Sequence, residues 1–409
     1  MRGKRLKVGF INTLYAPNEI GGAELAVRIA AEALVEHGHE AVVISLAPNG
    51  HYSVGDLRGV KVYYVPLANI YWKQGSQKRP VWARALWHLI DAYNPVMSSR
   101  IRRILKAELP DVVETNNLQG FSVAVWQAAA GLKIPVVQVL HDYYLSCVNS
   151  TMYRRGRNCG RQCRSCHIYC GPRRWLSNIP AVVAGVSHRT LTRILAARMF
   201  ARVQFKSVVP SAIVVAGRPP NRKNKHPGSP LIIGYLGRID RIKGVEILLR
   251  AVANIATTEV TLLLGGRGAN DYVEQLKQTF ASPNIHFLGF VRPDEFFAKI
   301  DMLVVPSLWE EPLGRVIYEG YSHGVPSIVS RVGGMPEIVS EGLTGYIVNV
   351  NDHVSLTKLI SAIVRQGLPA EQFVHACYRR SAEFTIESVF AKQLANWQRA
   401  VTAYQNSGA

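Results

Sequence analysis

The sequence contains no run of about 18 consecutive apolar residues, the length that a membrane-spanning helix needs, although 48% of its 409 residues are hydrophobic. An integral membrane protein is therefore not expected. The basic start, Met1 to Lys7, resembles the first part of a signal peptide, but the apolar run that follows is interrupted at Asn12. Such a short run favours a first β-strand over a signal peptide, so we expect a cytoplasmic protein.

Acidic residues are scarce, with 28 Asp and Glu against 48 Lys and Arg, and the formal net charge is +20. A field of this sign favours anionic partners such as nucleotides, nucleic acid or an acidic membrane surface. The alternative is charge spread evenly for solubility. The arginines are clustered instead: one group is Arg154, Arg155, Arg157, Arg161, Arg164, Arg173 and Arg174, and a second is Arg189, Arg193, Arg198 and Arg202. This clustering predicts a basic surface that binds a negatively charged partner.

Internal repeats and low-complexity segments are also missing, and the remaining pattern alternates short apolar strands with helices in two halves of the chain. Such alternation is typical of parallel, doubly wound α/β domains. The proline-rich, polar stretch between the halves indicates a linker. We predict an N-terminal domain (1–207) with a cysteine-rich insertion (143–175), a linker (208–230), a C-terminal domain (231–383) and a helical tail (384–409).

In the first half, strands are predicted at 7–11, 41–46, 60–65, 111–114 and 136–140, and helices at 25–37 and 121–130. In the second half, strands are predicted at 231–236, 260–264, 285–287, 302–305, 327–329 and 345–348, and helices at 245–256 and 272–280. The tail carries Trp397, which would pack back across the domain boundary.

Two cations follow the first strand of the second half. Arg238 comes directly after the strand and a glycine, and Lys243 lies five residues further on, before Gly244. Open α/β sheets bind ligands beyond the carboxyl ends of their strands. A phosphate bound there could accept two parallel hydrogen bonds from the guanidinium group of Arg238 and form an ion pair with the ammonium group of Lys243. The alternative is a tight turn with two solvated surface cations.

Weaker signals of the same kind follow the next two strands. Gly266 belongs to the stretch Leu264–Gly268, whose glycines would let the backbone approach a ligand. Phe290 belongs to the stretch Leu288–Val291, whose backbone could clamp a base. Either stretch could equally be an ordinary turn between a strand and a helix.

Two carboxylates eight residues apart form the most specific pattern in the sequence. Glu311 lies in the loop after the strand at 302–305, and Glu319 lies in the helix that follows. Carboxylates so placed can hold different parts of one polyol ligand. A solvated helix face is the alternative, but the flanking residues, which include Leu313 and Gly314, are apolar and glycine-rich.

This stretch resembles the E-x7-E motif of retaining glycosyltransferases of family 4, and the resemblance covers nearly the whole chain. The other matching motifs are Gly21–Glu24, Gly38–Glu40, His141-Asp142, Leu236–Arg238 with Lys243-Gly244, and Gly333-Gly334 with Pro336-Glu337. The order and spacing of these motifs carry the resemblance, because none of the short ones would do so alone.

The resemblance implies the GT-B fold: two Rossmann-like domains whose parallel sheets face each other across a cleft, with the C-terminal helix crossing back to the N-terminal domain. It implies transfer of a hexose, with retention, from a nucleoside diphosphate sugar to a lipid-linked or polysaccharide acceptor in cell-surface glycan synthesis. Catalysis would be independent of metal, which agrees with the absence of a D-x-D motif from the sequence.

The resemblance also implies the donor-binding residues. Arg238 and Lys243 would bind the donor diphosphate, and the amides of Gly21 and Gly22 would close on it from the other domain. Glu319 would bind the ribose hydroxyls. The remaining donor-site positions would be Gly266, Phe290, Leu313 and Gly314.

Catalysis is expected to rest on Glu311, His141, Arg238 and Lys243. Glu311 would hold hydroxyls of the transferred sugar, and His141 would lie at the sugar and acceptor side. Thr115-Asn116-Asn117 stands where many relatives carry histidine, a departure that bears on the acceptor.

Five of the six cysteines lie between residues 147 and 170. A C-x2-C pair with further thiolates fits a tetrahedral zinc site. The resemblance favours Cys147, Cys159, Cys163 and Cys166 as ligands and leaves Cys170 spare. Free or redox-active thiols and disulfides are the alternatives, although disulfides are less expected in a cytoplasmic protein. The zinc would be structural.

Residues 70–88 mix aromatic and basic side chains. The mixture suits an interfacial segment that meets anionic lipid, which would place the protein peripherally on the inner face of the membrane. An acceptor-loop helix with core aromatics is the alternative.

Two other functions remain. A nucleotide-sugar epimerase of the same fold is one. A basic, zinc-containing nucleic-acid-binding protein is the other, but it leaves Glu311, Glu319, Arg238 and Lys243 unexplained and no recognised nucleic-acid motif is present. Nucleic acid is therefore not an expected partner.

Overall fold

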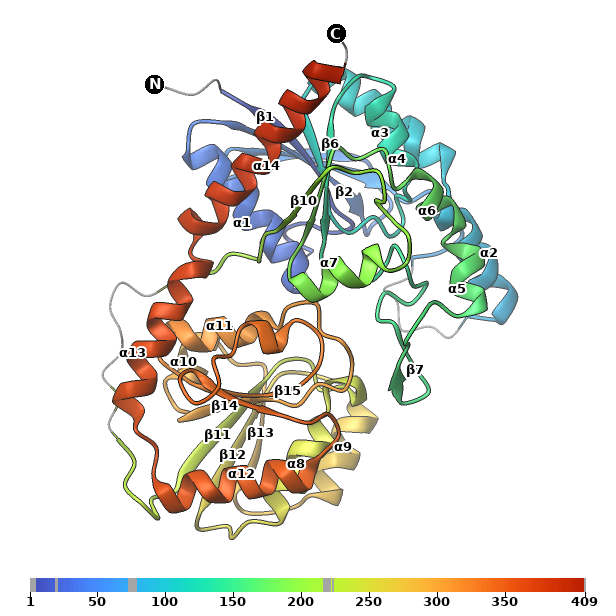
Figure 1. Ribbon diagram of the computed structural model, residues 1–409. Coiled ribbons are helices and arrows are strands. Elements are labelled where there is room, and N and C mark those ends of the chain that lie inside the picture. Colours follow the sequence, from blue (N-terminus) through green and yellow to red (C-terminus); the bar gives the residue numbers. More distant parts are fainter. Residues whose placement is uncertain (1–4, 19–20, 73–78, 216–221, 223, 408–409) are drawn as a thin grey trace. The chain divides into compact units, whose positions relative to one another are not determined.

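The computed structural model describes residues 5–18, 21–72, 79–215, 222 and 224–407. The chain separates into two compact units (Figure 1). The first unit comprises the chain up to Met152, Cys159–Ala212, and the chain from Ile386 onward. The second comprises Tyr153–Asn158 and Ile213–Thr385. The six residues 153–158 therefore group with the second unit, although the chain on either side of them belongs to the first.

The first unit is built on a sheet whose described strands run in the order β10-β9-β6-β5-β1-β2-β4-β3. Neighbouring strands are parallel except for the edge pair β3 and β4. The strands are β1 (Lys7–Ile11), β2 (Glu40–Ala47), β3 (Ser53–Leu57), β4 (Val60–Pro66), β5 (Val112–Thr115), β6 (Val136–Leu140), β9 (Val182–Gly185) and β10 (Phe205–Val208). The central strands β1, β5 and β6 are almost wholly buried, as expected for a parallel sheet.

The helices of the first unit begin at recognisable caps. Asn94 accepts a hydrogen bond from the amide of Met97 at 3.0 Å, with Pro95 at the first helical position, and Ser187 accepts one from the amide of Thr190 at 3.1 Å. The helices are α1 (Gly22–Glu36), α2 (Val81–Ala92), α3 (Pro95–Glu108), α4 (Ala124–Ala130), α5 (Arg164–Tyr169), α6 (Gly171–Leu176) and α7 (His188–Leu195).

The last helix, α14 (Ile386–Ser407), packs on the first unit although it follows the second unit along the chain. Trp397 is fully buried, and its ring lies edge-on to Phe10 of β1 with the centroids 5.8 Å apart. The indole Nε1 donates to Oε2 of Glu114 on β5 at 2.8 Å. One buried aromatic side chain therefore attaches the tail to the centre of the sheet.

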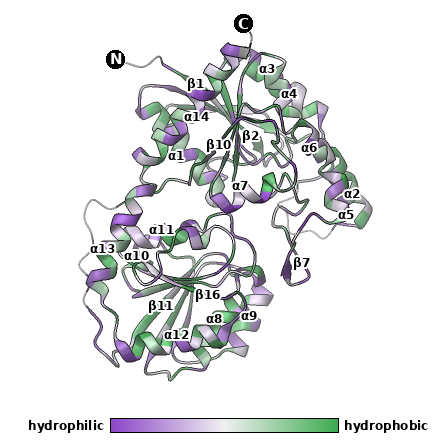
Figure 2. Ribbon diagram, viewed as in Figure 1, coloured by the Kyte–Doolittle hydropathy of each residue, from purple (hydrophilic) through white to green (hydrophobic). Residues whose placement is uncertain are grey.

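The second unit has a sheet of parallel strands in the order β13-β12-β11-β14-β15-β16 among the described residues. The strands are β11 (Leu231–Leu236), β12 (Val260–Gly265), β13 (Ile285–Gly289), β14 (Met302–Val305), β15 (Ser327–Ser330) and β16 (Gly345–Val348). The helices are α8 (Val245–Ala253), α9 (Asn270–Thr279), α10 (Pro293–Phe297), α11 (Arg315–Ser322), α12 (His353–Gln366) and α13 (Ala370–Ser381), and the 3₁₀ turns are η1 (Arg241–Lys243), η2 (Met335–Glu337) and η3 (Ala382–Phe384). Hydrophobic residues concentrate in the strands of both sheets (Figure 2).

Two parallel-sheet α/β units and a C-terminal helix confirm the predicted fold class. Strand β3 was not predicted, because four of its five residues are exposed and it lies at the sheet edge, where no apolar alternation is needed. Strands β9 and β10 were also missed. Strand β10 is exposed or half-buried, whereas β9 is fully buried and is no shorter than β14, which was predicted.

Most of the expected linker at 208–230 is described, but residues 216–221 and 223 lie outside the described residues. Arg222 attaches the described part to the second unit: it donates to the backbone carbonyls of Ile300 at 2.6 Å and His323 at 2.9 Å, and also to that of Phe297. The backbone of Lys225 exchanges hydrogen bonds with that of Leu368. The C-terminal end of this segment is therefore an ordered part of the second unit.

Candidate functional site

In the second unit, the loop after β11 brings Lys243 to the loop after β14. Asp240 caps η1 by accepting from the amide of Ile242 at 3.2 Å, and Gly244 ends it with a φ of +71°. A Cβ at Gly244 would lie 1.9 Å from the carbonyl oxygen of Pro306, so only glycine allows this approach. The amide of Leu308 donates to the carbonyl of Ile242 at 2.9 Å and joins the two loops directly.

Lys243 and Glu311 form an ion pair where these loops meet. Lys243 Nζ lies 2.5 Å from Oε1 of Glu311, whose residue is only 7% exposed. The same oxygen accepts from Ser307 Oγ at 2.8 Å and from Trp309 Nε1 at 3.1 Å. A carboxylate held by three donors is oriented before any ligand arrives, and such charge-assisted hydrogen bonds are the strong ones.

The backbone of Glu311 is fixed from a third loop. Gly333 has a φ of +64°, and a Cβ on it would lie 2.1 Å from the carbonyl oxygen of Glu311. The amide of Gly334 donates to that oxygen at 2.7 Å. The paired glycines after β15 therefore serve close backbone contact, which explains why this position needs a residue without a side chain.

Arg238 lies beside a cavity of about 470 Å³ that is also lined by Arg241, Arg267, Asp240 and Tyr272. The Arg238 side chain is 62% exposed, and its Nε lies 3.4 Å from Asp240 Oδ2. Three guanidinium groups around one opening of this size suit a phosphate-bearing ligand. Arg238 and Lys243 thus lie in consecutive parts of one loop, but Lys243 is already paired with Glu311.

The other predicted donor-site residues occupy the neighbouring strand ends. Gly266 donates its amide to Gly289 at 2.7 Å, and its position against Gly237 leaves no room for a side chain. Phe290 is 72% exposed, with the Arg267 guanidinium 5.5 Å from its ring centre. The backbone hydrogen bond between Gly266 and Gly289 holds the ends of these two neighbouring strands together.

On α11, Glu319 accepts from Arg315 Nε at 2.7 Å, one helical turn earlier. The helix begins after Gly314, which has a φ of +87°, and Leu313 before it is buried. A ribose that binds Glu319 would have to share this carboxylate with Arg315.

Asn158 was not predicted and contacts the loop that carries Glu311. It lies in the small hairpin of β7 (Tyr153–Arg154) and β8 (Arg157–Asn158). Its Nδ2 donates to the carbonyl of Leu308 at 2.8 Å, and its Oδ1 accepts from the amide of Glu310 at 2.9 Å. No spacing pattern indicates a contact across 150 residues, and Asn158 stands in the sequence as one polar residue within an arginine-rich segment.

In the first unit, His141 follows β6 and belongs to a buried hydrogen-bonded chain. Asn116 donates Nδ2 to Oε1 of Glu114 at 3.1 Å, so its Oδ1 accepts from His141 Nε2, 2.8 Å away. Nε2 therefore carries the proton of a neutral imidazole, and Nδ1 is left as an acceptor. Burial lowers the pKa of His141 to about 4, which keeps the ring neutral at physiological pH.

Glu114 connects this chain to the last helix, because its other oxygen accepts from Trp397. Burial raises the pKa of Glu114 to about 7, against the opposing effect of its two hydrogen bonds. Beside these groups lies a cavity of about 20 Å³, lined also by Ala30 of α1 and by residues 209–212, enough for roughly one water. The sequence indicated Trp397 only as a packing residue of the tail and Asn116 only as a departure that bears on the acceptor, and it assigned neither of them to this hydrogen-bonded chain.

Gly21 and Gly22 form the N-terminus of α1 and are exposed. The amide of Gly21 donates to Oε2 of Glu24 at 3.0 Å. A helix N-terminus attracts negative charge, and here the helix's own carboxylate takes part of that role. An anionic ligand at these amides would displace Glu24 from Gly21.

The four predicted zinc ligands are only partly brought together. The Cys147 and Cys166 thiols hydrogen-bond to one another, and Cys163 hydrogen-bonds to Cys166. The bond from Cys166, with help from nearby backbone amides, lowers the pKa of Cys147 to about 6, while that of Cys166 is raised. Within the described part of the chain, no group of three or more His, Cys, Asp or Glu side chains is arranged to hold a metal ion.

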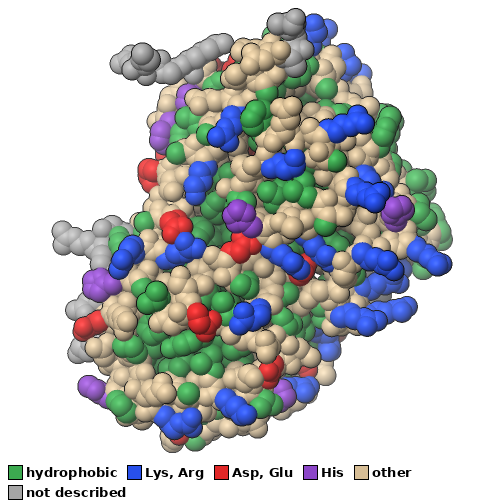
Figure 3. Space-filling view, viewed as in Figure 1, with side chains coloured by type: hydrophobic (Ala, Val, Ile, Leu, Met, Phe, Trp, Pro, Cys, Tyr) green, Lys and Arg blue, Asp and Glu red, His purple; other side chains and the backbone are tan. Residues whose placement is uncertain are grey.

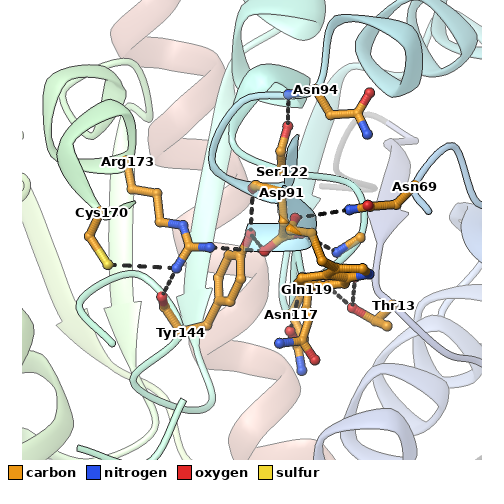
Figure 4. A network of polar contacts seen from close by, with 12 residues as sticks. Thr13, Asn69, Asp91, Asn94, Asn117, Gln119, Ser122, Tyr144, Cys170 and Arg173 are labelled. Atoms are coloured by element: carbon orange, nitrogen blue, oxygen red, sulfur yellow. Dashed lines mark hydrogen bonds and ion pairs between the residues drawn. The ribbon is translucent and has the colours of Figure 1, made fainter. Parts of the chain in front are cut away.

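The cysteine-rich insertion is anchored by a buried ion pair (Figure 4). Nη2 of Arg173 lies 2.9 Å from Oδ2 of Asp91 on α2, and both side chains are fully buried. Tyr144 donates its hydroxyl to the same oxygen at 2.9 Å, and the amide of Gly120 donates to Oδ1 at 2.6 Å. The Arg173 guanidinium also lies 3.8 Å from the centre of the Tyr144 ring. Satisfied hydrogen bonds on both partners are what make a buried charge pair tolerable.

Comparison with known proteins identifies both units. A family described as "Glycosyl transferase 4-like domain" matches residues 21–198, and one described as "Glycosyl transferases group 1" matches residues 230–366. An uncharacterised 42.6 kDa protein in the cps region of Klebsiella pneumoniae is 32% identical over 336 residues, which are 81% of this chain and 87% of that protein.

Solved structures show the same fold at low identity. Anabaena Alr3699/HepE in complex with UDP-glucose has a TM-score of 0.67 at 19% identity and covers 96% of this chain and 100% of its own. Sucrose-phosphate synthase from Thermosynechococcus elongatus has a TM-score of 0.72 at 18% identity and covers 98% of this chain and 100% of its own. These similarities agree with the predicted GT-B fold, and with the two family matches they show that the chain belongs to the group 1, family 4 glycosyltransferases.

Proposed function

We propose that this glycosyltransferase moves a hexose, with retention of configuration, from a nucleoside diphosphate sugar to a lipid-linked or polysaccharide acceptor in cell-surface glycan synthesis. The observation that carries the proposal is the Lys243–Glu311 pair, in which a lysine and a carboxylate from two strand-end loops lie 2.5 Å apart. The relative from a cps region supports a polysaccharide product. A uridine diphosphate sugar is the first donor to test, because Alr3699/HepE was solved with UDP-glucose.

In the proposed reaction, the nucleoside diphosphate leaves the sugar and the acceptor hydroxyl attacks from the same face of the sugar, through an oxocarbenium-like state. The enzyme must therefore stabilise the negative charge that develops on the leaving diphosphate. Arg238 and Lys243 would supply that stabilisation as fixed positive charges, the type of contribution that is often the largest in catalysis. As the phosphate takes up part of the Lys243 charge, Glu311 becomes free to accept from sugar hydroxyls. Ser307 and Trp309 keep its carboxylate in place during this exchange. In this proposal the reaction uses no metal ion.

On the acceptor side, His141 would act as a neutral group. Its Nδ1 is an acceptor once Nε2 has donated to Asn116, so it can accept a hydrogen bond from a sugar hydroxyl. Asn116 and Glu114 are positioning residues in this proposal, because they act through the imidazole.

Membrane attachment is proposed to be peripheral. No helix among the described residues is long and apolar enough to cross a bilayer. The two tryptophans of α2 differ, because Trp87 is buried and Trp82 is 70% exposed. Ile168 of α5 and Trp175 of α6 are also exposed, at 71% and 76%. Figure 3 shows hydrophobic side chains at the surface on the right-hand edge, where Figure 1 places α2 and α5, and Lys and Arg nearby. Exposed aromatics among basic residues suit the inner, anionic face of a membrane.

A structural zinc ion held by Cys147, Cys159, Cys163 and Cys166 also remains a proposal. The hydrogen-bonded chain of three of these thiols supports it, but the fourth would have to move, since the described side chains do not form a ready coordination group. Elemental analysis of purified protein tests it: about one zinc per chain supports the site, and metal-free protein with Cys–Cys bonds found by mass spectrometry excludes it.

The function is tested by incubating the protein with UDP-hexoses and lipid-linked or oligosaccharide acceptors, and by following both UDP release and the anomeric configuration of the product. Transfer with retention supports the proposal. Conversion of the donor to its epimer without transfer would favour the epimerase. The variant Glu311→Gln is expected to lose turnover by orders of magnitude while still binding UDP, because the bare nucleotide lacks the sugar that Glu311 holds.

A further inference from the structure

The cysteine-rich insertion and helix α7 together line a cavity of about 380 Å³ within the first unit. Its lining carries four arginines and a histidine, namely Arg161, Arg174, Arg193, Arg198 and His167, and no carboxylate among the described residues. The two arginine clusters of the sequence thus meet in one place. None of these five residues is among those assigned to the donor site.

Two of the arginines are held by hydrogen bonds that bridge the insertion and α7. Arg174 donates Nε to the carbonyl of Ala197 at 3.2 Å and Nη2 to Gln162 Oε1 at 2.7 Å. Arg193 donates Nη1 to the carbonyl of Gly160 at 2.7 Å. Both guanidinium groups are half-buried, so the cavity wall is fixed in place before a ligand binds.

The other lining arginines are more open to solvent. Arg161 and Arg198 are exposed, and neither they nor Arg174 form an ion pair with a carboxylate in the described part of the chain. The hydrogen bonds found for Arg174 use Nε and Nη2, which leaves the two N–H groups of Nη1 for a ligand. Several forked donors without a carboxylate partner match the geometry of phosphate oxygens.

We propose that this cavity binds a phosphate or diphosphate group of the acceptor substrate. The proposal rests on the glycosyltransferase function proposed above, which needs an acceptor on the first unit, and it names the chemical group recognised there. A volume of about 380 Å³ accommodates a diphosphate together with bound water. The donor diphosphate is assigned to Arg238 and Lys243, so the cavity is a second and separate anion site.

The diphosphate can come from two sources, a lipid-linked acceptor or a free soluble anion. The lipid source has support on the same helices, because Ile168 of α5 and Trp175 of α6 are 71% and 76% exposed and would suit a prenyl tail beside the headgroup. A free anion needs only the arginines. The two sources therefore differ in whether an apolar tail strengthens binding.

The test is calorimetric titration of full-length protein carrying Arg238→Ala, which weakens anion binding at the donor site, with inorganic pyrophosphate and with geranyl diphosphate. We expect one bound diphosphate per chain, with affinity that falls as salt rises. Adding Arg161→Ala and Arg198→Ala should weaken binding by roughly ten- to hundredfold per lost contact, as charge-assisted hydrogen bonds do. The matched control is Arg103→Ala with Lys106→Ala, which removes two positive charges from exposed positions of α3 and should change nothing.

Tighter binding of geranyl diphosphate than of pyrophosphate would support the lipid-linked source, and equal affinities would support the free anion. Equal pyrophosphate affinity with and without the two cavity substitutions, in protein with unchanged melting temperature, would overturn the site. If the proposal for the cavity is wrong, UDP binding and sugar transfer by the wild-type protein can still be observed. If instead no UDP-sugar is turned over while the cavity still binds pyrophosphate, the proposed function fails and the anion site stands.

Discussion

At the scale of single residues, the positions that bring the donor loops together are charged groups and the glycines between them. Lys243 can approach Glu311 only because Gly244 lets the backbone pass Pro306, and Glu311 is held from behind because Gly333 has no side chain. Substituting alanine at Gly244 or Gly333 would force a Cβ to within about 2 Å of a backbone oxygen. The positions of Lys243 and Glu311 therefore depend on neighbouring glycines that have no functional side chain.

Arg238→Ala and Lys243→Ala are each expected to weaken UDP binding by about 1.5–3 kcal/mol, the cost of losing a charge-assisted contact to phosphate. Lys243→Ala should also destabilise the folded protein, because it leaves the buried Glu311 carboxylate without its cation. Calorimetry with UDP gives the affinities, and Lys277→Ala on the exposed face of α9 is the matched control. Unchanged affinity in both variants would remove these residues from the phosphate site.

Glu114 makes stability depend on pH. Its pKa is raised to about 7 in the folded protein, above the ordinary value near 4.5, so the folded state holds its proton longer than the unfolded state does. Stability from this group is present at low pH and is lost as pH rises from about 4.5 through 7, by roughly 3 kcal/mol in total.

The variant Glu114→Gln cannot ionise and should not show this loss. Urea unfolding at pH 5 and pH 7.5 is the measurement, and the stability of Glu114→Gln relative to the wild type should increase between them. Glu108→Gln is the control: hydrogen bonds from Lys61, Lys7 and Tyr63 outweigh burial and lower the pKa of Glu108 to about 2, so its contribution to stability is lost only below about pH 4.5. The stability of Glu108→Gln relative to the wild type should therefore stay constant between pH 5 and pH 7.5. A constant difference between Glu114→Gln and the wild type would mean that Glu114 titrates normally.

At the scale of elements, α2 and the cysteine-rich insertion are joined through Asp91 and Arg173, whose charges are out of contact with water (Figure 4). Arg173→Met is expected to cost about 3–5 kcal/mol, because it leaves Asp91 charged and buried without its cation. Replacing both partners, with Asp91→Leu and Arg173→Met, should restore much of that loss. Chemical denaturation of the two single variants and the double variant measures the coupling between them. Additive losses would show that the pair does not act as a unit.

Strands β1, β6, β11, β14 and β16 have the bounds that the sequence predicts, because each is a short, continuous apolar run, the pattern typical of strands in a parallel sheet. Burial alone does not decide this, since β9 is fully buried and was missed, whereas β16 is mostly half-buried and was predicted. Strand β3 is exposed and carries no such run. For the site, the E-x7-E spacing indicates Glu311 and Glu319, since both lie on one loop and the helix that follows it. The sequence assigns no role to Asn158 or Trp397 in the site, because their hydrogen bonds span 150 and 283 residues and leave no local pattern.

At the scale of the whole molecule, the formal net charge is +20, and one of the arginine clusters, residues 154–174, directly precedes the exposed Trp175 in the sequence. Charge alone would also favour nucleic acid, and apolar exposure alone would favour another protein. The combination of Trp82 and Trp175 with flanking arginines favours an anionic bilayer, in which rings enter the interface and cations face the headgroups. Basic residues near such a surface contribute about 1 kcal/mol each, and salt screens this attraction.

Binding to vesicles that contain phosphatidylglycerol should therefore be strong at low salt and should weaken as salt rises, with little binding to neutral phosphatidylcholine vesicles. Trp82→Ser with Trp175→Ser should weaken binding at every salt concentration, because the rings contribute apolar burial that salt does not screen. Leu109→Ser, at a 68% exposed position after α3, is the matched loss of an exposed apolar side chain. Co-sedimentation across a salt series measures all three. Equal binding to both kinds of vesicle, or a tryptophan variant that binds like the wild type, would show that the basic, aromatic surface serves another partner.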